Sequence, residues 1–249
     1  LLGCPRKERL KQLHNYWLKP TELWWAYRGQ LMHGIAAQYV EGDPHAFAET
    51  RLAAMIPMGD ELVEITGQPD LVLLDRGHLV DYKTTKSVPG PWRTWVCPET
   101  GELVRERSFA WRNKMISCPH CEAGTHVARE IVVEAAPRPY PRHAQQVSLY
   151  ALLLAENGVE VQTGEIVYQD MSVQLRVPVA LMPPGEAMDL MKDRLRLHLQ
   201  PNIPDILTDP AELWECDYCP VRRACEMMYG GPVGKAGFNG NGHNDLEAE

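Results

Sequence analysis

Residues 67–83 decide the fold, and they read Gly-Gln-Pro-Asp-Leu-Val-Leu-Leu-Asp-Arg-Gly-His-Leu-Val-Asp-Tyr-Lys. Two runs that begin with apolar residues, Leu71–Leu74 and Leu79–Lys83, stand on either side of a polar segment. Gly77 lies in that segment, where a tight turn favours a residue that adopts positive φ. The stretch therefore predicts a β-hairpin.

Three charged side chains meet at one end of this hairpin. Asp81 and Lys83 are two residues apart on the returning strand, so they share a face of the sheet. Asp70 starts the first strand and approaches that face from beside it. Mg²⁺ and Mn²⁺ prefer carboxylate oxygens, and a lysine can orient a water or offset charge on a phosphate. The grouping favours a metal site with the Tyr82 carbonyl as a further ligand, whereas a solvated Asp–Lys pair explains Asp-x-Lys alone.

Composition limits the class of protein. The chain has 249 residues, which suits one domain with an insertion or a small appendage. No apolar run is long enough to cross a bilayer, and the first residues lack the order of a signal peptide, so we expect a cytoplasmic location without membrane contact. The net charge of −8 excludes uniform electrostatic attraction to nucleic acid but leaves room for local basic patches.

The seven cysteines are clustered and odd in number, which favours metal ligation over disulfides. Three of them fall within ten positions near the end of the sequence: Cys216, Cys219 and Cys225. This spacing is typical of a metal site, and both zinc and iron–sulfur clusters accept thiolates. Cys4 is the remaining candidate for a fourth ligand and would join the two ends of the chain.

Residues 87–140 form a proline-rich insertion with a second set of cysteines. Cys-Pro-x-Cys suits a zinc knuckle, for which the candidate ligands are Cys97, Cys118, Cys121 and His126, with His120 as an alternative to His126. A turn with unligated thiols explains the same pattern. The basic, aromatic segment 104–112 either lies along a nucleic-acid strand or packs on the main domain. Residues 230–249 are rich in Gly and Asn and predict a flexible tail.

Periodicity predicts the other elements. The expected helices are residues 4–17, 23–40, 142–155 and 186–199, and the expected strands are 62–66, 131–133, 165–169 and 173–177. Residues 46–55 predict a short helix or an irregular stretch. Strand 62–66 is expected to extend the hairpin into three antiparallel strands.

Five motifs in order resemble one superfamily. They are His33, Gly67-x-x-Asp70, Asp81-x-Lys83, Gln146-x-x-x-Tyr150 and the cysteines at both ends. Together they resemble the PD-(D/E)xK nucleases, in the RecB-like branch with iron–sulfur clusters. That branch holds the CRISPR-associated exonucleases of the fourth Cas family and the AddB-type repair nucleases. The resemblance covers residues 1–229 without the insertion, and Asp81 stands where close relatives usually have Glu.

The resemblance implies a restriction-endonuclease-like α/β (α+β) fold, with a mixed, mainly antiparallel sheet flanked by helices. It implies that His33, Asp70, Asp81 and the Tyr82 carbonyl bind Mn²⁺ or Mg²⁺, and that Lys83 positions the attacking water. Gln146 and Tyr150 would line the active site. A [4Fe–4S] cluster would be held by Cys4, Cys216, Cys219 and Cys225.

The implied function is trimming of single-stranded DNA ends or overhangs, as in prespacer processing during CRISPR adaptation, with the integrase complex as partner. The insertion is expected to contact DNA or that partner. Three alternatives stay open: a repair nuclease of AddB/RecB type, an inactive DNA-binding scaffold subunit, and a redox or zinc protein in which the hairpin is incidental.

Overall fold

The computed structural model describes residues 2–18, 20–85, 88–90, 92–108, 118, 129–131, 136–205 and 214–229. The chain divides into two compact units. The larger is the continuous segment Trp24–Ala187, and the smaller combines Leu1–Leu23 with Met188–Glu249. Within the described ranges, no helix is both long enough and apolar enough to cross a membrane.

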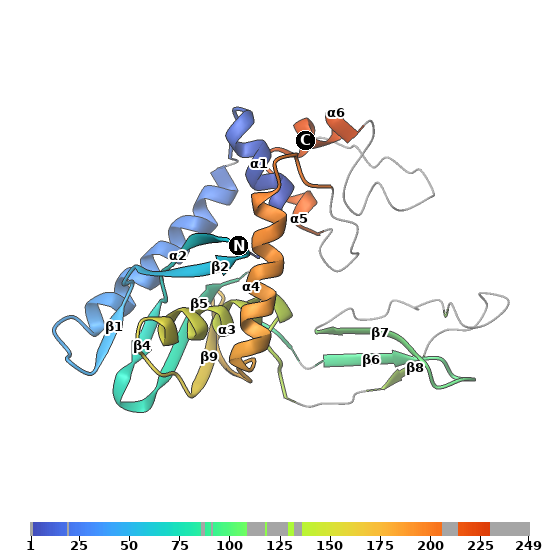
Figure 1. The fold of residues 1–249 in the computed structure, drawn as a ribbon. Coiled ribbons are helices and arrows are strands. Elements are labelled where there is room, and N and C mark those ends of the chain that lie inside the picture. The colour runs from blue at the N-terminus through green and yellow to red at the C-terminus, as the bar shows by residue number, and fades with distance from the viewer. Residues whose placement is uncertain are drawn as a thin grey trace. The chain divides into compact units, whose positions relative to one another are not determined.

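The larger unit is built on a five-stranded sheet (Figure 1). All neighbouring strands pair antiparallel except the third and fourth, which are parallel. In spatial order the strands are β1 (Ala46–Ala48), β4 (Leu71–Leu73), β5 (His78–Thr84), β9 (Thr163–Gln169) and β10 (Gln174–Val179).

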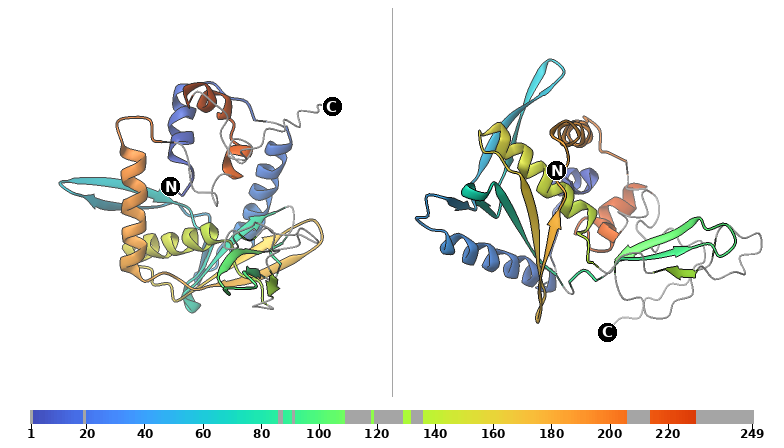
Figure 2. Two further views of the ribbon diagram at one scale, coloured as in Figure 1. Left: turned by 90° about the vertical axis from the view of Figure 1, so that its right-hand side faces the viewer. Right: turned by 90° about the horizontal axis from the view of Figure 1, so that it is seen from below.

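Helices flank this sheet on both sides, as Figure 2 shows for α2 (Pro20–Tyr39) and α3 (Pro141–Glu156). Leu79 and Ile166 face α3, where they join its buried Val147 and Leu154. Their neighbours Val80 and Val167 face the other way and pack with Val40, which follows α2. This alternation is the two-residue period of a strand with both faces covered. The predicted mixed, mainly antiparallel sheet flanked by helices is confirmed.

The hairpin between β4 and β5 forms as predicted. Its turn contains one 3₁₀ turn, η1 (Leu74–Arg76), which ends at Gly77. Gly77 has a φ of +52°, and a Cβ there would lie 3.3 Å from the Glu160 carbonyl oxygen. Glycine is therefore needed at this position for both its backbone conformation and its size.

Two strand predictions were wrong. Residues 46–58 are not helical or irregular; they form β1 and then β2 (Leu52–Met58). The strand after them, β3 (Glu61–Gly67), does not extend the hairpin but pairs with β2 in a separate two-stranded ribbon. β1 takes the place beside β4 instead, with Phe47 opposite Val72. The connection between β2 and β3 is a tight turn at Asp60, so the local pairing outcompetes the longer one.

The insertion contains a three-stranded antiparallel sheet. Its strands are β7 (Leu103–Ser108), β6 (Trp92–Val96) and β8 (Arg129–Ile131), in that spatial order. The strand expected at 131–133 thus ends at Ile131 within the described residues.

The smaller unit contains α1 (Pro5–Leu13), α5 (Trp214–Asp217) and α6 (Arg222–Tyr229), and α4 (Pro184–Leu199) runs into it. α1 packs against α6, and Leu10, Val221 and Cys225 form the buried centre of this contact. α1 ends at Leu13 rather than near residue 17, because His14 is extended. The tail predicted at 230–249 lies outside the described residues.

Candidate metal centre

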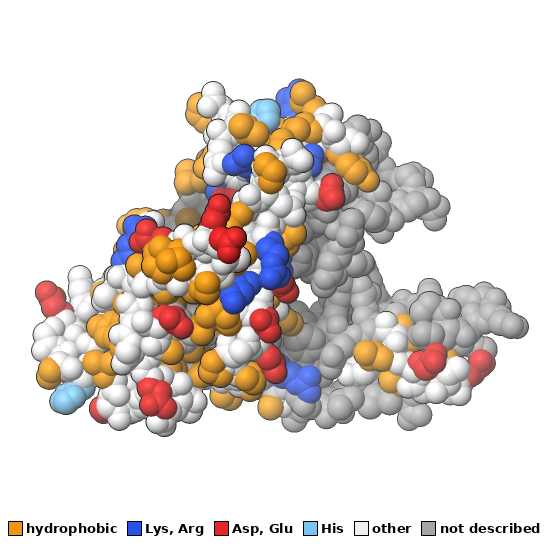
Figure 3. Space-filling model, viewed as in Figure 1, with side chains coloured by type: hydrophobic (Ala, Val, Ile, Leu, Met, Phe, Trp, Pro, Cys, Tyr) orange, Lys and Arg blue, Asp and Glu red, His pale blue; other side chains and the backbone are white. Residues whose placement is uncertain are grey.

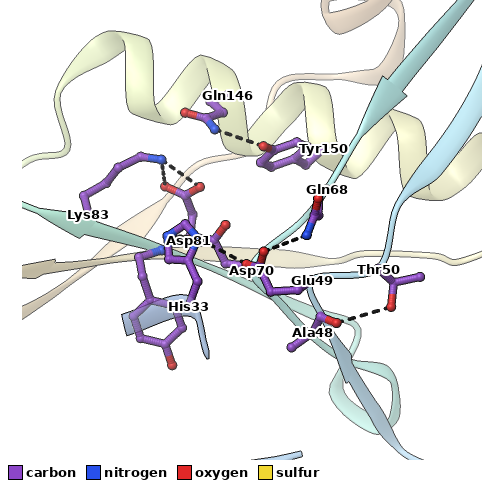
Figure 4. Close-up of polar contacts among 11 residues, drawn as sticks. His33, Ala48, Glu49, Thr50, Gln68, Asp70, Asp81, Lys83, Gln146 and Tyr150 are labelled. Atoms are coloured by element: carbon purple, nitrogen blue, oxygen red, sulfur yellow. Dashed lines mark hydrogen bonds and ion pairs between the residues drawn. The ribbon is translucent and has the colours of Figure 1, made fainter. Parts of the chain in front are cut away.

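β5 presents Asp81 and Lys83 on the sheet face that α3 covers (Figure 4). The Asp81 side chain is fully buried, and Lys83 Nζ donates a hydrogen bond of 3.0 Å to its Oδ1. Lys83 Nζ also lies 2.8 Å from Asp81 Oδ2, although not with hydrogen-bond geometry. The two-residue spacing seen in the sequence therefore brings both charges to one place, as predicted.

Asp70 stands immediately before β4 and joins this pair from the adjacent strand. Its side chain is 5% exposed, and its Oδ2 accepts a 2.6 Å hydrogen bond from the backbone N–H of Tyr82. This bond fixes the Asp70 carboxylate against β5. The Tyr82 side chain packs on the opposite face with Val80. The Tyr82 carbonyl stays a predicted ligand.

His33 reaches the same carboxylate from α2. Its Nε2 lies 3.4 Å from Asp70 Oδ2, and its Nδ1 lies 3.2 Å from Glu49 Oε1. Sequence reasoning missed Glu49. It lies between β1 and β2 with a φ of +50°, the only non-glycine residue in the described chain with positive φ. Its N–H donates to the Pro69 carbonyl, and Gln68 Nε2 donates to its Oε2 over 2.7 Å.

One ligand atom from each of His33, Glu49 and Asp70 lies within 4.8 Å of the other two. Two buried oxygens at this place, Glu49 Oε1 and Asp81 Oδ2, accept no hydrogen bond. Lys83 Nζ lies 2.8 Å from the Asp81 oxygen and His33 Nδ1 lies 3.2 Å from the Glu49 oxygen, but neither contact is a hydrogen bond. Buried oxygens that lack a hydrogen bond are stabilised by a bound cation. One imidazole and several carboxylates therefore fit a divalent metal ion.

Burial dominates the electrostatics of the two aspartates. It raises the pKa of Asp81 to about 6, against the lowering effect of Lys83. Burial also raises the pKa of Asp70, against the lowering effects of His33 and Lys83. The Asp70 carboxylate disfavours ionisation of Asp81, and the Glu49 carboxylate disfavours ionisation of Asp70. A bound cation would reverse this balance, because its charge favours both ionised forms.

Gln146 and Tyr150 of α3 lie above Asp81 (Figure 4). Gln146 Nε2 donates a 3.1 Å hydrogen bond to the Tyr150 hydroxyl, so the pair shares one helix face as predicted. Burial raises the Tyr150 pKa, and the carboxylates of Asp81 and Asp70 add to the shift. The two side chains thus border the site.

Gly67 explains the first half of the Gly-x-x-Asp motif. A Cβ at Gly67 would lie 2.6 Å from Leu153 Cδ2 and 3.1 Å from Tyr150 Cε1. A real side chain at this position would therefore require the side chains of Leu153 and Tyr150 on α3 to shift. The glycine keeps Tyr150 beside the aspartates.

The four cysteines predicted to bind a cluster all fall in the smaller unit. Cys216 and Cys219 pack beside the buried Cys225, and the Cys4 N–H donates to Glu215 Oε2 over 3.2 Å. Burial, followed by the nearby thiols of Cys4, Cys219 and Cys225, raises the pKa of Cys216 to about 11. In the described chain, no three of these sulfur atoms all lie within 4.8 Å of one another.

In the insertion, Cys97 and Cys118 are buried together against Val104. Hydrogen bonds from the Thr100 side chain and backbone lower the pKa of Cys97 to about 6, with the N–H 3.4 Å from the sulfur. Cys121, His126 and His120 lie outside the described residues, as do the side chains of segment 105–112. Zinc binding here stays a prediction.

Comparison with solved structures finds proteins of similar fold. The fold is similar to that of SSO0001, a protein of known crystal structure. The TM-score is 0.51 at 17% sequence identity, over 90% of this chain and 82% of SSO0001. At this identity the similarity concerns the fold alone. No family model and no curated protein matches the sequence.

Proposed function

We propose that this protein is a metal-dependent deoxyribonuclease of the PD-(D/E)xK type that shortens single-stranded DNA ends or overhangs. The observation that carries the proposal is the meeting of His33, Asp70, Asp81 and Lys83 in one site. They come from helix α2, from strand β5 and from the residue that precedes β4, and an incidental charge pair would not require such a convergence.

The proposal includes a restriction-endonuclease-like core. An antiparallel hairpin, β4–β5, carries the acidic residues, and α3 leads back to β9, which lies parallel to β5. Such a parallel crossover needs a covering helix, and this helix also carries Gln146 and Tyr150. The elements that build the core of the fold therefore also carry the residues of the proposed site.

Each residue has a chemical role in this proposal. His33, Glu49, Asp70 and Asp81 would hold Mn²⁺ or Mg²⁺, which when bound offsets phosphate charge and lowers the pKa of a water. Lys83 would orient the attacking water and stabilise negative charge on the phosphate. Gln146 and Tyr150 would contact the DNA beside the scissile bond. In hydrolysis the water oxygen bonds to phosphorus and the bond between phosphorus and the leaving oxygen breaks. The water loses a proton, and the leaving oxygen gains one.

The cofactor we propose for the smaller unit is a [4Fe–4S] cluster on Cys4, Cys216, Cys219 and Cys225. Two observations support it. The thiols of Cys4, Cys219 and Cys225 lie near enough to Cys216 to raise its pKa, and a buried arginine donates a hydrogen bond to the sulfur of Cys225. Such clusters are held by four cysteine thiolates. Ligation would join the two ends of the chain and contribute to folding.

The biological setting we propose is end trimming of DNA before integration in CRISPR adaptation, with the integrase as partner. It rests on the resemblance of the motifs. Co-purification with the integrase would support this setting. A genomic neighbourhood of helicase and recombination genes would instead favour the repair nuclease.

The test is cleavage of end-labelled single-stranded DNA in Mn²⁺. We expect shortening by the wild-type protein and a loss of at least about 10²-fold in Lys83→Ala and Asp81→Ala, the scale at which removal of one charge-stabilising group acts. Asp189→Ala, which removes an exposed carboxylate on α4, is the matched control and should retain full activity.

The outcomes separate the alternatives. DNA binding without cleavage by all the proteins would identify a scaffold. Cleavage that persists in Lys83→Ala would contradict the assigned site, and cleavage in excess EDTA would exclude metal dependence. Thermal unfolding of each variant checks that a loss of activity is not a loss of fold.

A further inference from the structure

Arg6 is a buried arginine beside the predicted cluster ligands. It lies on α1, is 9% exposed, and belongs to the smaller unit. Its Nε donates a 3.1 Å hydrogen bond to Cys225 Sγ, and its Nη1 donates one of 2.9 Å to the Pro204 carbonyl. Among the described residues, no carboxylate forms an ion pair with it.

Within the ranges that the structure describes, the buried charge of Arg6 meets a sulfur and a carbonyl oxygen and no negative partner. A guanidinium stays protonated in proteins, and burying it is costly unless an anion lies beside it. A sulfur in its neutral thiol form does not supply that anion. A thiolate that ligates a metal does, because metal binding removes the proton. The environment of Arg6 is therefore suited to the loaded site.

We propose that Arg6 is a positioning residue for the cluster, which holds the Cys225 thiolate by a charged hydrogen bond and raises the reduction potential of the cluster. This inference rests on the proposed cluster. Hydrogen bonds to the sulfurs are among the factors that set such potentials. Reduction adds one negative charge, so a cation on a ligand sulfur stabilises the reduced form more than the oxidised form.

The chain offers a matched control on the same helix. Arg9 is also an arginine of α1, but it forms an exposed hydrogen bond with Gln12 over 3.4 Å. Arg9→Gln therefore removes the same charge from α1 without touching a cysteine. Arg6→Gln removes the charge at the sulfur, and Arg6→Lys keeps a charge without the two-pronged geometry.

The test is a redox titration of the iron-loaded proteins, purified without oxygen. Dithionite supplies one electron per cluster, and electron paramagnetic resonance follows the reduced form. We expect the Arg6→Gln potential to fall so that reduction is about tenfold less favourable, which is about 59 mV for one electron. Arg6→Lys should shift less in the same direction, and Arg9→Gln should match the wild type.

An Arg6→Gln potential equal to that of the wild type, at equal iron content, would overturn the inference. If Arg6→Gln does not retain iron, Arg6→Lys decides, and an unchanged potential in that variant overturns it. Wild-type protein without iron and sulfide also overturns it, together with the proposed cluster. None of these results bears on the Lys83 and Asp81 cleavage test, so failure of the two proposals is distinguishable.

Discussion

At the scale of single residues, Asp81 is the side chain whose ionisation the fold opposes most clearly. It is fully buried, its pKa is raised to about 6, and one of its oxygens accepts no hydrogen bond. In the proposed site, protons and a divalent cation would therefore compete for this carboxylate. The cation binds the ionised form, so affinity must rise with pH until Asp81 is deprotonated.

We expect Mn²⁺ affinity to fall as the pH drops through about 6, by up to about tenfold per pH unit for one competing proton. Calorimetric titration with Mn²⁺ at several values between about pH 5 and 8 measures how the affinity depends on pH. This range of about three units includes the pKa of Asp81. Asp81→Asn removes one of the two aspartates with a raised pKa and should make the pH profile shallower in this range. A wild-type affinity independent of pH would contradict the prediction.

Glu49 provides a second prediction at this scale. Glu49→Gln keeps the size and one oxygen that can accept the hydrogen bond from Gln68, but it removes the charge that faces His33. We expect Mn²⁺ affinity to fall by about 10- to 100-fold, the range found when groups around a metal are replaced. Calorimetry at constant pH measures it. Glu165→Gln, on the partly exposed surface of β9, serves as the control, and equal affinities in both variants would exclude Glu49 as a ligand.

At the scale of elements, α3 and the end of β3 touch through Gly67. A Cβ at this position would lie 2.6 Å from Leu153 and 3.1 Å from Tyr150. We expect Gly67→Ala to lower the free energy of unfolding by about 1–3 kcal/mol, as overpacking does, and to lower cleavage activity by displacing Tyr150. Urea unfolding and the cleavage assay measure the two effects.

Gly34→Ala is the control for that substitution. Gly34 lies in α2, and a Cβ there would meet nothing within 4 Å. Because alanine favours helix, this change should raise the free energy of unfolding by about 0.4–1 kcal/mol. If Gly67→Ala is equally neutral or stabilising, the close approach of α3 is not a constraint on the sequence.

Sequence predicted the elements whose signals are local. The β4–β5 hairpin has its apolar runs and glycine turn, and α3 has a clear helical period, so both lie where expected. β1 has only three residues and no usable period, and the choice of β2 as partner for β3 depends on competition between two pairings. Glu49 was missed for the same reason: its place is set by a strained backbone between two strands that the sequence did not reveal.

At the scale of the whole molecule, the net charge of −8 shapes how DNA can bind. Figure 3 shows Lys and Arg side chains interspersed with Asp and Glu on the face in view. The carboxylates of the metal centre add to the repulsion of phosphate until a cation binds. DNA affinity should therefore depend on the metal more than on salt.

We expect single-stranded DNA to bind at least about tenfold more weakly in EDTA than in Ca²⁺, a hard cation with the same preference for oxygen ligands. Fluorescence anisotropy of labelled DNA measures this. The net charge of −8 predicts a shallow dependence on salt. Equal affinity in EDTA and Ca²⁺ would place the DNA away from the metal centre.

The smaller unit is assembled from two segments that the larger unit separates in sequence. Ribosomes make proteins from the amino terminus, so α1 and Cys4 emerge long before α6 and Cys225. The sheet can therefore fold before the cysteines that follow it in the sequence, Cys216, Cys219 and Cys225, have been made. The proposed cluster could therefore be loaded only after Cys225 has been made, and a product truncated before Cys216 would remain colourless.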